Sequence, residues 1–142
     1  MRIRPRSLTL AALLLSSPAY GTDLMITDAW IRAMPGHLPA AGYFTIRNGG
    51  RDPVSLSGAS SPACGMLMLH RSSSDNGMSS MSDVESIAIP AGGTMRFAPG
   101  GYHLMCMDPK PLMHGARVPI TLQFSNGRTL ATTFLVKDAR GR

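Results

Sequence analysis

The sequence predicts a single all-β domain, an antiparallel β-sandwich or barrel, and three observations lead to this prediction. Short runs of β-branched and apolar residues recur along the chain, and helical periodicity is almost absent. Glycine and proline, 15 and 11 of the 142 residues, punctuate the chain between these runs. A content of 44% hydrophobic and 15% charged residues excludes a disordered tail and a coiled coil.

Nine runs are expected to form strands, with turn signals between them. The strands are predicted at residues 25–32, 42–48, 54–60, 66–71, 84–89, 94–97, 102–107, 117–124 and 129–136. The turn signals are NGGRDP at 48–53, PAGGT at 90–94, APGG at 98–101 and SNGR at 125–128. Asn-Gly in the last of these lies between two β-rich runs and predicts a hairpin. The polar segment 71–83 is expected to be a loop that exposes Met78 and Met81, and Trp30 is expected to pack in the core.

The N-terminus has the three parts of a secretory signal peptide. Arg2, Arg4 and Arg6 precede the apolar run LTLAALLL, and the small and turn-forming residues SSPAYGTD follow it. The apolar run is far shorter than the roughly 20 residues that span a bilayer. We therefore expect a cleaved leader at 1–21 and an exported domain at 22–142, with no membrane-spanning segment in the mature form.

The formal charge of +6 does not indicate a nucleic-acid partner. Without the leader arginines the chain has 11 basic and 8 acidic residues, and the basic ones are scattered singly without interleaved aromatics. The acids form no pair beside a histidine in a nucleophile motif, and the glycine pairs are turn residues. An enzyme is therefore not expected.

The two cysteines, Cys64 and Cys106, lie 42 residues apart. In an oxidising compartment they can form one disulfide, which requires Cα atoms within about 7 Å. A small apolar role for each cysteine is the alternative, and the sequence leaves both interpretations open.

Histidine and methionine share one face on two of the expected strands. Side chains two residues apart point the same way, so His103 and Met105 lie together while Leu104 and Cys106 point to the core. An earlier strand carries Met66, Met68 and His70 on one face. The polar segment between these strands offers Met81, so the three segments form a plausible enclosure for a metal ion.

The types of these side chains indicate which metal they suit. Thioether sulfur is soft, neutral and needs no deprotonation; it suits Cu(I) and is a poor ligand for Mg, Ca or Mn. Zinc prefers thiolate, imidazole and carboxylate ligands. A site of two histidines and two methionines also lacks the thiolate of a blue-copper electron-transfer centre. Ordinary surface and core positions for these residues are the alternative interpretation.

The spacing His-x10-Met-x21-His-x-Met is met without gaps by His70, Met81, His103 and Met105. With this spacing the sequence closely resembles the periplasmic PCu(A)C copper chaperone family. The resemblance extends over about residues 25–136. It is carried by DAWIRAMPG at 28–36, AAGYFTIRNGG at 40–50, LSGASSPAC at 56–64, IPAGGTMRFAPGGYHLMCM at 89–107 and VPITLQF at 118–124.

This resemblance implies a cupredoxin-like antiparallel β-sandwich of Greek-key type that binds one Cu(I) at an exposed site through those four residues. It implies a periplasmic location and delivery of copper toward the binuclear centre of cytochrome c oxidase, often alongside a Sco-type thiol protein. Met68 and Met107 are expected to form an apolar wall near the copper. Met78 is close enough to Met81 in sequence to substitute for it.

The sequence departs from the family pattern in two places. Cys106 stands where the family commonly has an apolar residue, so a disulfide with Cys64 would be a local staple and not a pair of ligands. Many relatives have a C-terminal tail rich in Met and His that binds further copper. Because this chain ends in KDARGR, a Cu(II) site in such a tail is not expected.

Other functions are weighed against copper delivery. A copper-tolerance or storage protein would use the same site. A cupredoxin-type electron carrier would need Cys106 as a thiolate near two histidines. Only His114 follows Cys106, however, and strand alternation turns Cys106 away from His103. A structural β-sandwich without metal would leave the exposed Met78 and Met81 unexplained.

Overall fold

The computed structural model describes residues 23–142, and these residues form ten β-strands and no helix. The strands are β1 (Leu24–Arg32), β2 (Ala40–Asn48), β3 (Val54–Ser60), β4 (Cys64–Asp75), β5 (Met78–Asp83), β6 (Ile87–Ile89), β7 (Thr94–Phe97), β8 (Tyr102–Pro109), β9 (Arg117–Phe124) and β10 (Thr129–Lys137). The all-β prediction is confirmed, and every predicted strand is present with ends shifted by a few residues. The leader predicted at 1–21 lies outside the described residues. From residue 23 onward, no helix is long and apolar enough to cross a membrane.

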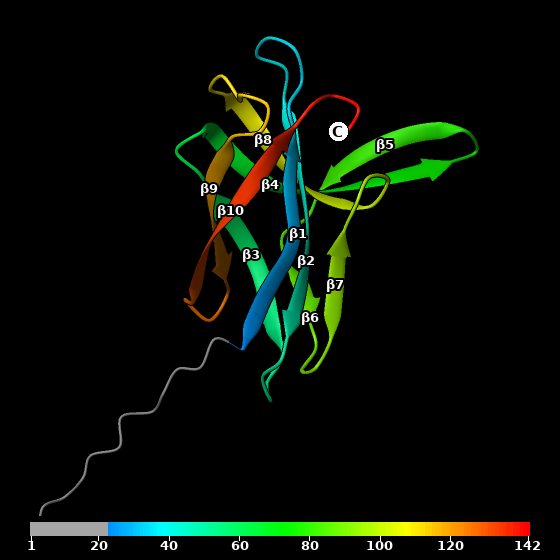
Figure 1. Cartoon of the computed structure of the whole chain (residues 1–142). Helices are drawn as coiled ribbons and strands as arrows, with labels where there is room; N and C mark the ends of the chain where they lie inside the picture. The colour runs from blue at the N-terminus through cyan, green and yellow to red at the C-terminus, as the bar shows by residue number, and fades with distance from the viewer. Residues whose placement is uncertain (1–22) are drawn as a thin grey trace, which may run out of the picture.

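All ten strands belong to one hydrogen-bonded sheet that curls into a sandwich (Figure 1). The order is β5-β4-β8-β2-β1-β10-β9-β3-β6, and β7 pairs with the part of β2 that β8 leaves free. Neighbouring strands are antiparallel except β1 and β10, which run parallel. This pair is an exception within the antiparallel sandwich that the sequence predicts. Parallel pairing is possible there because the long intervening chain serves as the crossover connection that parallel strands require.

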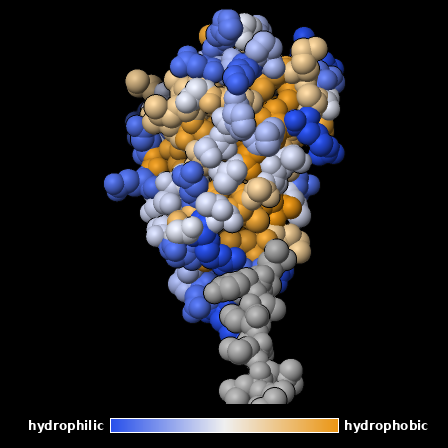
Figure 2. Space-filling model, turned by 90° about the vertical axis from the view of Figure 1, so that its left-hand side faces the viewer, coloured by the Kyte–Doolittle hydropathy of each residue, from blue (hydrophilic) through white to orange (hydrophobic). Residues whose placement is uncertain are grey.

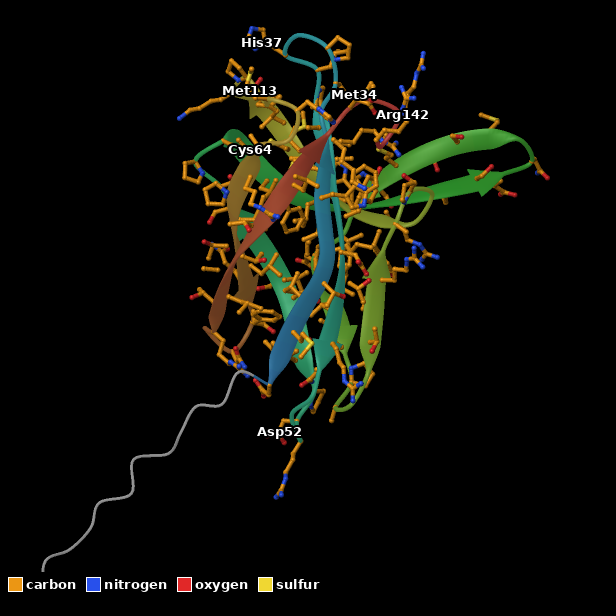
Figure 3. All side chains as sticks on the ribbon, in the orientation of Figure 1. Met34, His37, Asp52, Cys64, Met113 and Arg142 are labelled. Carbon is orange, nitrogen blue, oxygen red and sulfur yellow. A yellow bond between two sulfur atoms is a disulfide. The ribbon has the colours of Figure 1, made fainter. Side chains whose placement is uncertain are left out.

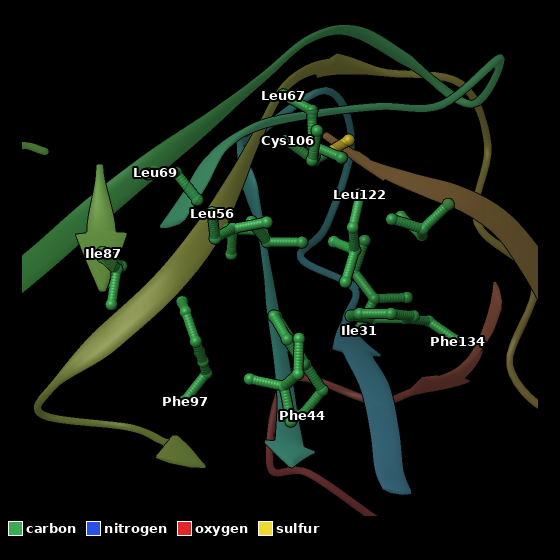
Figure 4. Packing of buried hydrophobic residues seen from close by; sticks show 14 of the residues in the cluster. Ile31, Phe44, Leu56, Leu67, Leu69, Ile87, Phe97, Cys106, Leu122 and Phe134 are labelled. Atoms are coloured by element: carbon green, nitrogen blue, oxygen red, sulfur yellow. The ribbon is translucent and has the colours of Figure 1, made fainter. Parts of the chain in front are cut away.

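One face of every strand except β5 contributes to the core between the layers (Figure 4). Alternate residues of β9 are buried, as the two-residue period of a strand requires. The ring of Phe44 stacks on that of Phe97 with centroids 4.2 Å apart, and it meets the ring of Phe134 at 5.5 Å. Burial of a side chain of this size contributes about 1.5–3 kcal/mol, so each of these three rings contributes to stability.

A bulge in β1 moves Trp30 out of the core. The register of β1 against β2 shifts just before Trp30, and Asp28 there has a φ of +53°. The extra residue exchanges the two faces, so Leu24 before it and Ile31 after it are both buried. Trp30 is half-buried on the outer face, where its ring centroid lies 4.7 Å from that of Tyr43. The prediction that Trp30 packs in the core is therefore wrong, because simple alternation does not anticipate the bulge.

Strands β4 and β5 form a hairpin that projects from the body of the sandwich (Figure 1). Their pairing starts with His70 opposite Asp83 and continues outward to the turn. Asn76 and Gly77 make this turn, and both have positive φ, +47° and +77°, as a type I′ turn requires. The prediction of a loop at 71–83 is wrong. Its serine-rich flanks look like a loop, but Asn-Gly is a hairpin signal and the flanks pair with each other.

The turn geometry predicts the effect of replacing Gly77 by valine. A β-branched residue in the left-handed region costs about 1–2 kcal/mol, so the hairpin should open more often. Hydrogen exchange measures this: the backbone amides of β5 should exchange faster, and those of β9 should keep their protection. Ser74→Val, in the strand beside the turn, is the matched control. Equal exchange in β5 of both variants would contradict this role of the turn.

The outer surface away from the hairpin combines hydrophobic and hydrophilic residues. Figure 2 views this side and shows hydrophobic side chains along the strands and hydrophilic ones toward both ends. The ends hold the loops, whose backbone polar groups need water. Apolar side chains on the surface of a monomer are common. This face therefore assigns no function by itself.

Candidate metal centre

Two histidines face each other across the β4–β8 pair. His70 lies directly opposite His103, and Met68 lies opposite Met105 in the next pair on the same face. The two imidazole centroids are 5.6 Å apart, and the rings are inclined at 73°. Leu104, between His103 and Met105, is fully buried in the core. The predicted division of these strands into a core face and a His/Met face is thus confirmed.

His103 presents a buried nitrogen that has no partner. The residue is only 3% exposed, and its Nδ1 lies 3.3 Å from the carbonyl oxygen of Gly101. When Nδ1–H donates to that carbonyl, Nε2 carries the lone pair, and Nε2 is buried without a hydrogen-bond partner. Burial lowers the pKa of His103; the Gly101 carbonyl opposes this shift, and the charge of His70 adds to it. The imidazole is therefore kept neutral, the form that binds metal ions.

The lowered pKa of His103 predicts that the metal-free protein loses stability in mild acid. The unfolded chain protonates this residue near its ordinary pKa of 6.5, whereas the folded chain does so only at lower pH. Between the two pKa values the unfolded state binds more protons, so the free energy of unfolding decreases as the pH falls. Denaturant unfolding between about pH 7.5 and 5.5 measures the slope. A slope that stays unchanged in His103→Gln would show that another group is responsible.

His70 is approached from its other side by the hairpin strand β5. Its Nε2 lies 2.8 Å from Oδ1 of Asp83, the residue opposite it on that strand. Both ring nitrogens of His70 are buried and make no hydrogen bond. Our sequence analysis missed Asp83, because its position follows from the hairpin register. The Asn76-Gly77 turn was the signal that could have located it.

Met81 lies beside the histidine pair, on the edge strand β5. It is two residues from Asp83 and so on the same face of the hairpin as His70. As a diagonal neighbour of His70 it stands about 7–8 Å away, a distance that long side chains bridge. Its side chain is 61% exposed. Met78, in contrast, lies next to the turn, about 17 Å farther along the strand from Asp83, so the structure does not bring it to the site.

Methionines continue the histidine-bearing face of β4 and β8. Beyond the pair of Met68 and Met105, Met66 lies directly opposite Met107. We call these four side chains the methionine ladder. Met66 is 58% exposed and the other three are half-buried. The sequence indicated which face each methionine takes, but their pairing depends on the register between two strands far apart in the chain.

A disulfide joins Cys64 to Cys106 behind this face, with the two Cα atoms 5.4 Å apart. It ties β4 to β8, the strands that carry His70 and His103. Cys106 is fully buried and points away from Met105 into the core. A blue-copper centre requires a cysteine thiolate, and neither cysteine is free to supply one. The alternative of a cupredoxin-type electron carrier is therefore disfavoured.

Apart from the carboxylate of Asp83, which contacts His70, the side chains at this place make a soft and neutral donor set. Among residues 23–142, no three His, Cys, Asp or Glu side chains are grouped so that they could hold a metal ion. The buried histidine nitrogens without partners belong to His70 and His103, and thioethers flank them. Imidazole with thioether suits Cu(I) or Ag(I) better than zinc or the hard divalent ions. The residues present thus fit a soft monovalent cation.

Comparison with known proteins identifies a family that covers nearly all of the described residues. Residues 24–136 match the model of a family described as "Putative lipoprotein LpqE-like". A protein of Leifsonia xyli subsp. xyli (strain CTCB07), also named as a putative lipoprotein, is 37% identical over 120 residues. The aligned part covers 83% of this chain and 72% of that protein.

Solved structures identify the fold. The copper-bound PCuAC domain from PmoF2 has a TM-score of 0.68 and 22% identity, with coverage of 82% of this chain and 93% of that domain. The apo form of DR1885 from Deinococcus radiodurans has a TM-score of 0.65 and 33% identity, with coverage of 99% and 96%. The Cu(I) form of DR1885 has a TM-score of 0.63 and 37% identity, with coverage of 77% and 74%. The predicted cupredoxin-like fold is confirmed: the chain shares its fold with the solved PCuAC domains, and it belongs to the LpqE-like family.

Proposed function

We propose that this chain is a copper chaperone that binds one Cu(I) through His70, Met81, His103 and Met105. The observation that carries the proposal is the facing pair of histidines, whose buried ring nitrogens include Nδ1 of His70 and Nε2 of His103 without a hydrogen bond and lie beside thioethers. A buried nitrogen without a partner costs about 1–3 kcal/mol, and a bound cation would remove this cost. The relative DR1885, 37% identical, has been solved with Cu(I), which supports the choice of ion.

Release of the ion would begin at Met81. This residue lies on β5, an edge strand whose residues are all exposed, whereas His103 lies within the sheet and is buried. The hairpin can therefore move without disturbing the core. An acceptor ligand that replaces the Met81 thioether first, and the remaining ligands in turn, would take the ion without leaving it free in water.

The acceptor in this proposal is the copper subunit of cytochrome c oxidase, with a Sco-type thiol protein as a further partner. We place the protein in the periplasm after removal of the leader at 1–21. The Cys64–Cys106 disulfide supports this location, since such bonds persist in oxidising compartments. The protein would act as a carrier and not as an enzyme. A storage or copper-tolerance protein would hold the same ion but would not deliver it.

An anaerobic titration tests the proposal. The disulfide-bonded protein is titrated with Cu(I) against a chromogenic competitor, with ascorbate as the reductant because thiols would bind copper and reduce the disulfide. We expect one tightly bound Cu(I) per chain and X-ray absorption from both nitrogen and sulfur ligands. The loaded protein is then mixed with a soluble oxidase copper domain. Absence of tight binding would refute the site, and binding without transfer would favour storage.

Met81→Leu tests the release step. The variant should bind Cu(I) more weakly and change the rate of transfer, because one of four ligands is lost. Met78→Leu is the matched control, since it changes an exposed methionine on the same strand that lies far from the histidines. If affinity and transfer rate in Met81→Leu equal those of the control, Met81 is not a ligand.

A further inference from the structure

The methionine ladder extends the soft-donor surface beyond four ligands. Directly opposed residues in a sheet have Cβ atoms about 4.5–5.5 Å apart, and successive positions on one face are about 7 Å apart. Met66 and Met107 therefore lie within side-chain reach of each other and of Met68. If Met105 binds the ion held by the histidines, these three thioethers remain free on the same face.

Packing in the core does not explain these three methionines. The core side of β4 and β8 is formed by other residues, such as Leu67, Leu104 and Cys106. The ladder is on the opposite face, where Met66 is 58% exposed. A flexible side chain that stays in water gains little burial energy and keeps its rotamer entropy. Its soft sulfur atom, in contrast, can be used at an exposed position.

The ladder leads away from the histidines toward one end of the molecule. Met66 lies two residues from Cys64, the first residue of β4. Figure 3 shows Cys64 at the same end of the long axis as Met34 and Met113. The side chains of Met34 and Met113 are 39% and 70% exposed. Exposed thioethers are thus present at the end from which the ladder starts.

We propose that Met66, Met68 and Met107 form a second, weaker site for Cu(I), from which the ion moves to the histidine pair. The step is an exchange of neutral ligands: thioether bonds of the outer site break as bonds to Met105 and the histidines form, and no electron or proton is transferred. Met68 and Met105 are opposite each other, so the two sites adjoin. The inference rests on the proposed function in that it takes Met105 as a ligand of the tighter site.

Silver(I), a redox-inert ion of the same softness, is the probe. The protein is labelled with methyl-13C methionine and titrated with Ag(I), and each methyl signal is followed by NMR. The first equivalent should shift the methyl groups of Met81 and Met105. The second should shift those of Met66, Met68 and Met107. If the methyl groups of Met66, Met68 and Met107 do not shift at two equivalents, the second site is overturned.

Two double variants and one control variant separate this inference from the proposed function. In M66L/M107L, which nearly preserves side-chain volume, the affinity of the second step should fall at least about tenfold. Met25→Leu, an equally exposed methionine on β1, should keep both steps. In H70A/H103A the tighter binding of Ag(I) should be lost, while the methyl signals of Met66, Met68 and Met107 should still shift. If M66L/M107L still binds the second Ag(I) with unchanged affinity, the site at Met66, Met68 and Met107 is refuted and the histidine site stands. If the unaltered protein lacks the first, tighter binding step, the histidine site is refuted and the site at the three methionines is still tested by its own signals.

Discussion

Replacing His103 by alanine should lower the affinity for Cu(I) by at least about 100-fold, or about 2.7 kcal/mol. Loss of a group that merely supports a metal ligand costs 10- to 100-fold, and His103 is proposed to be a ligand itself. Its Nε2 is already buried, unpartnered and set in the unprotonated form by Gly101, so little reorganisation is needed on binding. Competition titration with a chromogenic Cu(I) chelator measures the change.

Two controls make this result specific. His37→Ala removes an exposed histidine that lies in the loop between β1 and β2, and it should leave the affinity unchanged. Thermal unfolding of the metal-free His103→Ala protein checks that the fold is retained. Should His103→Asn, which keeps a polar side chain in the buried position, bind Cu(I) as tightly as the unaltered protein, the imidazole is not a ligand.

Removing the disulfide in C64A/C106A should lower the free energy of unfolding by about 4 kcal/mol. The bond closes a loop between residues 42 apart, and a loop of this length gives about that value in the chain-entropy estimate. The substitution also leaves a cavity at Cys106, which is fully buried. Denaturant unfolding monitored by circular dichroism measures the change in the free energy.

Reduction of the unaltered protein provides the matched comparison for the disulfide. Its stability under reducing conditions should approach that of C64A/C106A, because the covalent link is then absent from both. The strands that carry His70 and His103 would also be held less firmly, so Cu(I) affinity should fall in the double variant. A loss of stability below about 1 kcal/mol in both cases would show that the sheet alone determines the geometry of the site.

Local patterns were sufficient to predict most of the fold. Alternation of apolar and polar residues placed Leu104 and Cys106 in the core and His103 and Met105 on the other face. The turn signals between the strands were equally informative: the predicted hairpin at 125–128 joins β9 to β10. These features depend on residues close in sequence, since the period of a strand and the geometry of a turn are local properties.

Features that depend on register were not predictable in the same way. The strand β5 was mistaken for a loop because its exposed serines resemble a linker, although the Asn76-Gly77 turn pairs it with β4. The contact of Asp83 with His70 follows from that pairing. A lone large aromatic such as Trp30 is expected in the core, and the bulge at Asp28 that places it on the outer face leaves no clear mark in the pattern of hydrophobic residues.

The sequence by itself determined the all-β class, the two faces of β4 and β8, and the soft character of the candidate ligands. Only the tertiary structure decided that His70 is opposite His103, that the methionines form a ladder, and that Cys64 is bonded to Cys106. The physical reason is that side-chain direction alternates along a strand, whereas strand pairing depends on the packing of the whole core. A shift of one residue between β4 and β8 would separate the histidines and turn one of them toward the core.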